Sequence, residues 1–300
     1  MAFNIDKDEL RKKLRNLYDL GDIAWSYFIR NIIAAVLILF ISFATIIVST
    51  QTLLRRGIQA DVIADQLMNT FLVIGLSVIY ITLLIVFPVG YRFIKKAYNY
   101  YRDFRDLVKT AELADSAAFS IVRIDYEFSR DEYLLYRIPS DLPKKYLYTY
   151  IAGAIASTIS IYLIAISIKS FVINLNINTM RSIDVVDVFI RSLAWNPWTI
   201  PVFIISFIIG LLFLYYYVKF FELLWSGYGV HEASYMMYIV IINYIINMLS
   251  IFIQALNNVD TLLSLVTLLL LYIIAKKLQK LPQRLSPLIE RAVEYTQEST

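Results

Sequence analysis

The residues best suited to chemistry are the polar side chains of one apolar stretch, residues 235–254. The stretch carries amides and a hydroxyl at spacings of four, three, four and three residues, namely Asn243, Asn247, Ser250, Gln254 and Asn257. At 100° per residue they fall within an arc of roughly 80° of a helix. Because hydrocarbon cannot solvate amides, this polar seam is expected to face other protein or water. Glu232, eleven residues before Asn243, extends the same edge.

The seam has two interpretations, and the sequence leaves both open. In the structural one, the amides form hydrogen bonds to neighbouring helices, each worth about 0.6–2 kcal/mol in a membrane. In the functional one, they line a hydrated path or a solute site, with Glu232 recruiting a cation or proton at its mouth. No charged residue lies between Glu232 and Asp260. Ion-coupled carriers usually have such a charge, so a channel or a path for neutral solutes fits better.

The sequence argues against an enzyme. It has no cysteine and one histidine, His231, which excludes disulfides, cysteine-ligated zinc, iron–sulfur clusters and multi-histidine metal sites within the chain. The acid pairs Asp61/Asp65 and Asp184/Asp187 have helical spacing, but nearby arginines favour a solvated loop over a divalent-cation site. No Walker A, glycine-rich dinucleotide or His-Glu-x-x-His motif is found. We therefore predict no catalytic residues, no cofactor and no metal.

Composition indicates an all-α polytopic integral membrane protein. Hydrophobic residues make up 59% of the 300 residues and charged residues 17%, against about 45–50% and about 25% in soluble domains. The apolar residues form blocks of about 20, the length that crosses a bilayer. Six transmembrane helices are expected, at about 31–49, 71–90, 147–168, 199–218, 235–254 and 259–275.

Two polar segments accompany this bundle. Residues 8–29 form a basic amphipathic helix that lies either on the anionic leaflet or against a cytoplasmic stalk. Residues 91–114 predict that stalk, a helix continuing the second span, with a seam packed within the chain at Ile94, Ala97, Tyr101, Phe104, Val108 and Ala111. The alternation in 119–128 suggests a short strand.

These elements divide the chain into six parts. Pro88 is expected to kink the end of the second span, small residues at 153–160 to allow close helix packing, and 183–194 to form an amphipathic helix. A short helix is expected after Pro282 and Pro287. The parts are an interfacial helix (1–30), hairpin 1 (31–90), a small cytoplasmic insertion (91–146), hairpin 2 (147–218), hairpin 3 (219–275) and a cytoplasmic tail (276–300).

Lysine and arginine counts set the orientation. The insertion holds eleven, the first 31 residues six, the tail five and the 219–234 loop one, whereas the opposite side holds four. The positive-inside rule then predicts a multi-pass protein of the cell membrane with both termini in the cytoplasm. The abundance of isoleucine and tyrosine is typical of archaeal proteins from AT-rich genomes.

Two functions remain open. The first is transport, by a permease or channel that uses the seam on the fifth span. The second is a non-enzymatic membrane subunit of a larger machine, for secretion or DNA transfer, that docks cytoplasmic partners through 91–146. The expected partners are the lipid bilayer and either a second copy or a cytoplasmic protein. Basic and tyrosine residues alternate in 92–109, but topology and anionic lipid explain them better than nucleic acid does.

Overall fold

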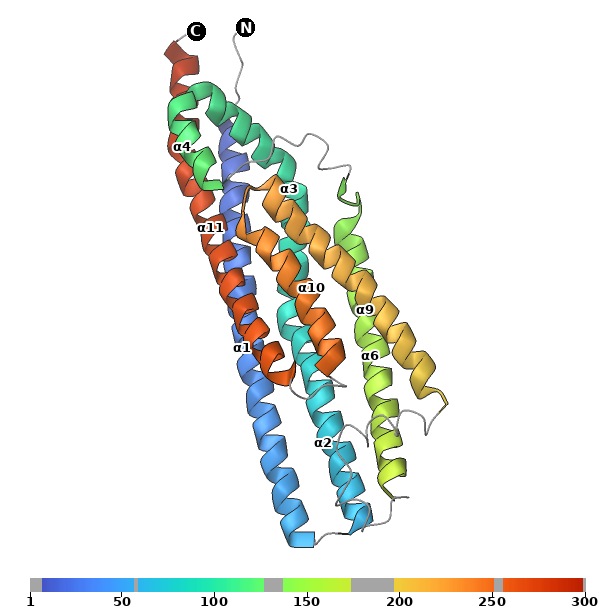
Figure 1. Cartoon of the computed structure of the whole chain (residues 1–300). Helices are drawn as coiled ribbons and strands as arrows, with labels where there is room; N and C mark the ends of the chain where they lie inside the picture. Colours follow the sequence, from blue (N-terminus) through green and yellow to red (C-terminus); the bar gives the residue numbers. More distant parts are fainter. Residues whose placement is uncertain (1–6, 57–58, 127–136, 174–196, 251–255, 299–300) are drawn as a thin grey trace.

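The computed structural model describes residues 7–56, 59–126, 137–173, 197–250 and 256–298. Within these residues all regular secondary structure is helical (Figure 1). The elements are α1 (Lys7–Arg56), α2 (Ala60–Ile81), the π-helix η1 (Thr82–Val86), α3 (Phe87–Ala114), α4 (Ser116–Tyr126), α6 (Leu142–Ile173), α9 (Thr199–Glu222), the π-helix η2 (Leu223–Gly227), α10 (Glu232–Ser250) and α11 (Leu256–Glu298).

The long helices lie beside one another in chain order. α1 packs on α2, α2 on α6, α6 on α9, α9 on α10, α10 on α11, and α11 returns to α1. α3 continues α2 through η1 and packs against α1 and α11. The beginning of α1 and the end of α11 lie at one end of the molecule, here called the termini side, and the end of α1 lies at the opposite side (Figure 1).

The apolar helices indicate an all-α membrane protein, as the composition predicted. Five described stretches are long and apolar enough to cross a membrane: Lys7–Arg55, Asp61–Ala114, Leu142–Ile173, Thr199–Gly227 and Thr261–Glu294. In three of them only 6% of the most apolar window is buried within the chain, so lipid or another subunit must cover the rest. α10 is helical where the fifth span was predicted but is not among the five, so the count of six stays a prediction.

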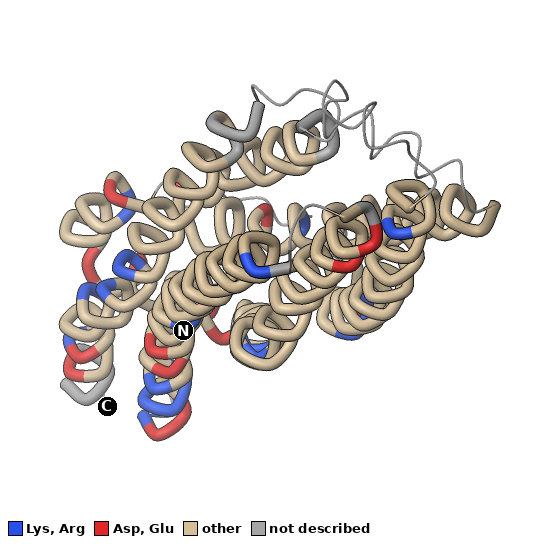
Figure 2. The backbone as a smooth tube through the Cα atoms, turned by 90° about the horizontal axis from the view of Figure 1, so that it is seen from below, with Lys and Arg blue, Asp and Glu red and all other residues tan. Residues whose placement is uncertain are grey.

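The largest buried core lies on the termini side. It spans the polar bundle, which we define as residues 7–30 of α1, α3, α4 and residues 275–298 of α11. In Figure 2 charged residues gather where α1 and α11 approach the chain ends, while long stretches of the other helices are uncharged. Two predictions are confirmed here: the second span continues as a stalk, and the stalk seam is buried, with Val108 only partly so.

The N-terminal amphipathic helix packs on the stalk and does not lie alone on a leaflet. Leu10, Leu17 and Ala24 are buried in the polar bundle, and α1 runs unbroken from this helix into the first apolar span. Across the contact, Lys13 pairs with Asp106 at 2.8 Å and Lys96 with Asp19 at 2.5 Å. Of the two interpretations left open by the sequence, the stalk-packed one is correct.

The predicted strand in 119–128 is wrong for the residues described there, which form α4 up to Tyr126. Asp115 caps the helix, because its Oδ1 accepts the backbone N–H of Ala118 at 2.9 Å. The buried residues Phe119, Val122 and Tyr126 recur at helical spacing. The alternation that suggested a strand was too short to compete with this cap and this apolar face.

A short helix was predicted after Pro282 and Pro287; the residues there are helical, but as the end of α11, which continues through both prolines to Glu298. Each proline removes one helical hydrogen bond. Burial of the flanking side chains compensates for this loss, because Leu281, Leu285 and Leu288 are at most 4% exposed. Tertiary packing of the polar bundle therefore overrides the local signal of the prolines.

Pro88 is accommodated without ending the helix. The five residues before Phe87 form η1, and the chain then resumes as α3 with Pro88 in its first turn. A π-helical turn shifts the hydrogen-bond register and so accommodates a residue that lacks an N–H. The second span is thereby joined rigidly to the stalk.

A close contact between backbones joins α1 to α11. A Cβ added to Gly21 would lie 2.8 Å from the Cα of Gln279 and 3.1 Å from the carbonyl oxygen of Leu278. Pro282 deprives that same carbonyl of its helical N–H partner. Only glycine lets the two backbones approach this closely, and the contact fixes how α1 and α11 are aligned along their lengths.

Gly21→Ala is therefore expected to destabilise the protein. The added methyl meets backbone, which cannot rotate away, and such overpacking costs about 1–3 kcal/mol. This outweighs the gain of up to about 1 kcal/mol from replacing a helical glycine. Thermal unfolding in detergent, followed by size exclusion, should show a lower midpoint.

Gly153→Ala is the matched control. Its added Cβ would meet nothing nearer than 3.6 Å, from Ile209, so its midpoint should stay level or rise. Equal midpoints for the two variants would contradict a backbone contact at Gly21.

Candidate functional site

The structure describes part of the predicted seam, on α10. Asn247 donates its side-chain N–H to Oδ1 of Asn243 at 3.4 Å. Asn243 is half-buried and Asn247 is exposed on the surface of the isolated chain. The side chains of Ser250, Gln254 and Asn257 lie outside the described residues. The described part of the seam is therefore an amide pair on one helix, open to the surroundings at Asn247.

Glu232 is engaged at the opposite end of α10. Its carboxylate pairs with Lys277 of α11 at 2.9 Å. The Tyr126 hydroxyl donates to the backbone carbonyl of Lys277 at 3.2 Å. Burial raises the pKa of Tyr126 to about 12, and the charge of Glu232 adds to the rise. Glu232 thus joins α10 to α11 on the termini side, at the point where Tyr126 of α4 also contacts α11. It lies eleven residues before Asn243 of the amide pair.

An aromatic layer separates the polar bundle from the apolar spans. The Tyr27 and Tyr217 hydroxyls lie 2.9 Å apart, and Phe87 stacks on Tyr150 at 4.0 Å between ring centroids. A Cβ on Gly90 would lie 2.8 Å from the Tyr27 ring. Aromatic residues with a polar tip are typical of a membrane–water boundary. The layer unites four helices, so sequence spacing on any one of them could not reveal it.

The turn between η2 and α10 is anchored in the polar bundle. Tyr228 is fully buried, and its hydroxyl donates to the carbonyl of Ala97 at 2.6 Å. Gly229 follows with φ 71°, in the left-handed region that suits glycine. Beside it, His231 contacts the Tyr235 hydroxyl at 3.1 Å. This turn joins α9 and α10 to the stalk.

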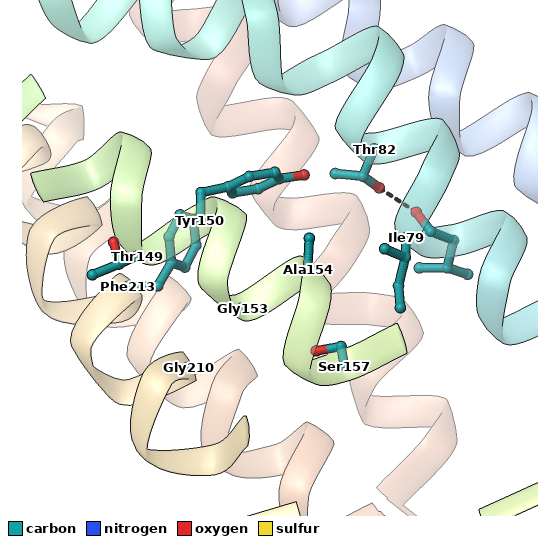
Figure 3. A pocket seen from close by; sticks show the side chains of 10 residues that line it. Ile79, Thr82, Thr149, Tyr150, Gly153, Ala154, Ser157, Gly210 and Phe213 are labelled. Atoms are coloured by element: carbon teal, nitrogen blue, oxygen red, sulfur yellow. Dashed lines mark hydrogen bonds between the residues drawn. The ribbon is translucent and has the colours of Figure 1, made fainter. Parts of the chain in front are cut away.

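A cavity of about 250 Å³ lies between α2, α6 and α9 (Figure 3). Tyr150 and Phe213 line it toward the aromatic layer, and Ser157 lines it further along α6. The Thr82 hydroxyl donates to the carbonyl of Val78 at 2.7 Å, and Thr149 donates to that of Lys145 at 2.8 Å. Its lining is thus mostly apolar, and these threonine donors are engaged in their own helices.

An apolar surface lies on the outside of α4, beyond every predicted span. Ile121 and Ile124 are 66% and 77% exposed, and Leu113, near the end of the preceding helix α3, is 73% exposed. Two ion pairs hold α4 against α11, Asp115 with Arg291 at 2.9 Å and Asp125 with Arg284. Because α4 is held so firmly on its inner face, its outer apolar residues are presented to solvent as a fixed patch.

Some of the basic and tyrosine residues of the stalk make contacts within the chain. Tyr101 is 3% exposed in the bundle core, and Tyr100 donates its hydroxyl to Asp19 at 3.2 Å. Lys96 is engaged by the same Asp19. The assignment of the basic residues to topology and anionic lipid stays a prediction.

Comparisons with protein-family models, with curated proteins and with solved structures found no match. Within the described residues, no group of three or more His, Cys, Asp or Glu side chains is placed to hold a metal ion. Function must therefore be argued from two features of this chain, the patch on α4 and the amide pair on α10.

The attachment of α4 should depend on Asp115. The N–H of Ala118 and, to a lesser degree, Arg291 hold the pKa of this carboxylate below its ordinary value of 3.8. The ionised carboxylate of Asp115 therefore stabilises the folded protein above pH 3.8. This stabilisation is lost as the pH falls through the lowered pKa. At neutral pH, Asp115→Ala should increase hydrogen exchange of the α4 amides more than Asp115→Asn, which keeps the cap but loses the charge. Equal exchange in both variants would contradict a role for the cap.

Proposed function

We propose that the protein is a non-enzymatic membrane subunit that docks a cytoplasmic protein through the outer face of α4. The observation that carries the proposal is the exposed apolar patch at Ile121 and Ile124 of α4. It lies on the polar bundle, which the lysine and arginine distribution places in the cytoplasm. Exposed apolar patches outside a membrane are typical of protein-binding sites.

The geometry of α4 supports docking of a partner helix or groove. Ala117, Ile121 and Ile124 are exposed at spacings of four and three residues, the pattern of a helix that binds by one face. η1 joins the second span to α3 without a break, and only Asp115 separates α3 from α4. A partner bound here would therefore be coupled mechanically to the helices in the membrane.

The test is capture of the partner from native membranes. Ile121→Asp places a charge in the patch without disturbing the buried face of α4, so it should abolish co-purification of the bound protein while size exclusion of the membrane protein is unchanged.

The matched control is Gln283→Asp, which adds the same charge to an exposed position of α11. It should retain the partner. Retention of the partner by Ile121→Asp, or its loss in both variants, would refute docking through α4.

Transport is a second candidate, and the amide pair of α10 favours it. Two hydrogen-bonded amides on an apolar helix, with one of them exposed, suit contact with water or a polar solute. In proteoliposomes, Asn247→Leu should lower the flux of a solute that the wild-type protein carries. Unchanged flux would remove the amide pair from any transport path.

A further inference from the structure

The cavity between α2, α6 and α9 is formed where small residues face one another on apolar helices. Gly153 and Ala154 of α6 and Gly210 of α9 line it, and a Cβ on Gly153 would meet nothing nearer than 3.6 Å. All three helices belong to stretches long and apolar enough to cross a membrane. The cavity of about 250 Å³ is therefore a gap in the packing of helices that a bilayer surrounds.

The cavity begins at the aromatic layer and extends away from the termini side (Figure 3). Tyr150, whose ring stacks on Phe87 in that layer, lines one end, and Ser157 lines the other. The seven residues from Tyr150 to Ser157 correspond to about 10 Å along α6, and half the hydrocarbon thickness of a bilayer is about 15 Å. The cavity thus follows most of the depth of one leaflet, the one on the termini side.

The lining of the cavity suits hydrocarbon better than water. Val78 and Ile79 contribute apolar side chains, and the hydroxyls of Thr82 and Thr149 donate to carbonyls of their own helices. Cavities with so few polar groups to offer stay dry and accept apolar molecules. Val78 is 41% exposed on the isolated chain, so the cavity is open and a molecule from outside the chain can enter it.

The Tyr150 hydroxyl supplies a hydrogen-bond donor at the end of the cavity nearest the aromatic layer. Within the described part of the chain this hydroxyl makes no hydrogen bond. Stacking on Phe87 at 4.0 Å and an edge contact with Phe213 at 5.4 Å hold the ring in place. Figure 3 shows the side chain extending from α6 toward Thr82. A fixed donor thus stands at one end of an apolar cavity.

We propose that the cavity binds one hydrocarbon chain of a membrane lipid from the leaflet on the termini side. The Tyr150 hydroxyl donates to an oxygen that links this chain to glycerol. Such oxygens lie at the boundary between hydrocarbon and headgroups, the level at which aromatic residues with a polar tip gather. An apolar lining with one directed polar group is also the usual design of a small-molecule site.

The bound chain fills the space that glycine and alanine leave between the three helices, and so stabilises their packing. The site is separate from the patch on α4. Binding of lipid would stand if Ile121→Asp kept its partner, and docking through α4 would stand if the cavity held no lipid.

Photolabelling in vesicles tests whether a chain occupies the cavity. The probe is phosphatidylglycerol with a diazirine along one acyl chain, and mass spectrometry locates the labelled residues of the full-length protein. We expect labelling at Tyr150 and Ser157. Ala154→Leu fills the cavity and should lower this labelling by about tenfold.

The matched control is Ala152→Leu, which makes the same substitution two residues away on the exposed face of α6. It should leave the labelling of Tyr150 and Ser157 unchanged. Equal labelling of these residues in Ala152→Leu and Ala154→Leu would overturn the proposal.

Tyr150→Phe tests the hydrogen bond, because it removes the hydroxyl and keeps the ring on Phe87. Native mass spectrometry from detergent should show about three- to tenfold weaker retention of phosphatidylglycerol. Tyr148→Phe is the control, since Tyr148 is 66% exposed and does not line the cavity. Equal retention in the two variants would overturn the role of the Tyr150 hydroxyl.

The competing occupant is water, and the absence of native cysteine allows a direct test. Ala154→Cys and Ala152→Cys are treated in vesicles with a small, charged thiosulfonate that does not cross membranes. Hydrocarbon around both positions should give roughly equal, slow labelling. Labelling of Ala154→Cys about tenfold faster than Ala152→Cys would show a hydrated cavity and overturn the proposal.

Discussion

The close packing of α1 on α11 at Gly21 is the constraint on which the rest of the structure depends. Two long helices whose backbones touch cannot slide along one another without breaking the contact. The contact therefore fixes how far α11, and with it α10, extends alongside α1. It also completes the polar bundle, because α3 and α4 pack against the surface that α1 and α11 form together.

Continuity of the helices transmits this constraint across the membrane boundary. α1 runs from the polar bundle into the first span, α2 passes through η1 into the stalk, and α11 passes two prolines without ending. At the boundary the aromatic layer, including Tyr27 and Tyr217, fills the space between α1, α3, α6 and α9. The patch on α4 and the amide pair on α10 thus belong to one rigid framework, on opposite sides of that layer.

Periodicity predicted those features of the fold that depend on one helix at a time. The buried faces of residues 8–29 and 91–114 were correct because a helix buries a stripe at fixed spacing. The strand was wrong because the cap at Asp115 favours a helix there. The continuity of α11 through its prolines was missed because it depends on tertiary burial of residues such as Leu285. The six-span count rested on apolar length alone, which cannot reveal where a hairpin sits relative to its neighbours.

For the candidate site, the sequence identified the amides but not their setting. Asn243 and Asn247 do lie together, as their spacing of four requires, whereas Glu232 is held by Lys277 across a contact that no local pattern encodes. The α4 patch was missed because the segment was interpreted as a strand. In a helix, Ile121 and Ile124 share one face, and their exposure follows from the burial of the other.

The alignment of α1 with α11 is tested most directly by disulfide formation between paired cysteines in native membranes. Ala24 and Ala275 are both buried at this contact, so cysteines placed at these two positions should cross-link efficiently. A different alignment, in which α11 is shifted along α1 by ten residues, or about 15 Å, would bring Leu285 opposite Ala24. Efficient cross-linking of the 24/285 pair in place of the 24/275 pair would contradict the account.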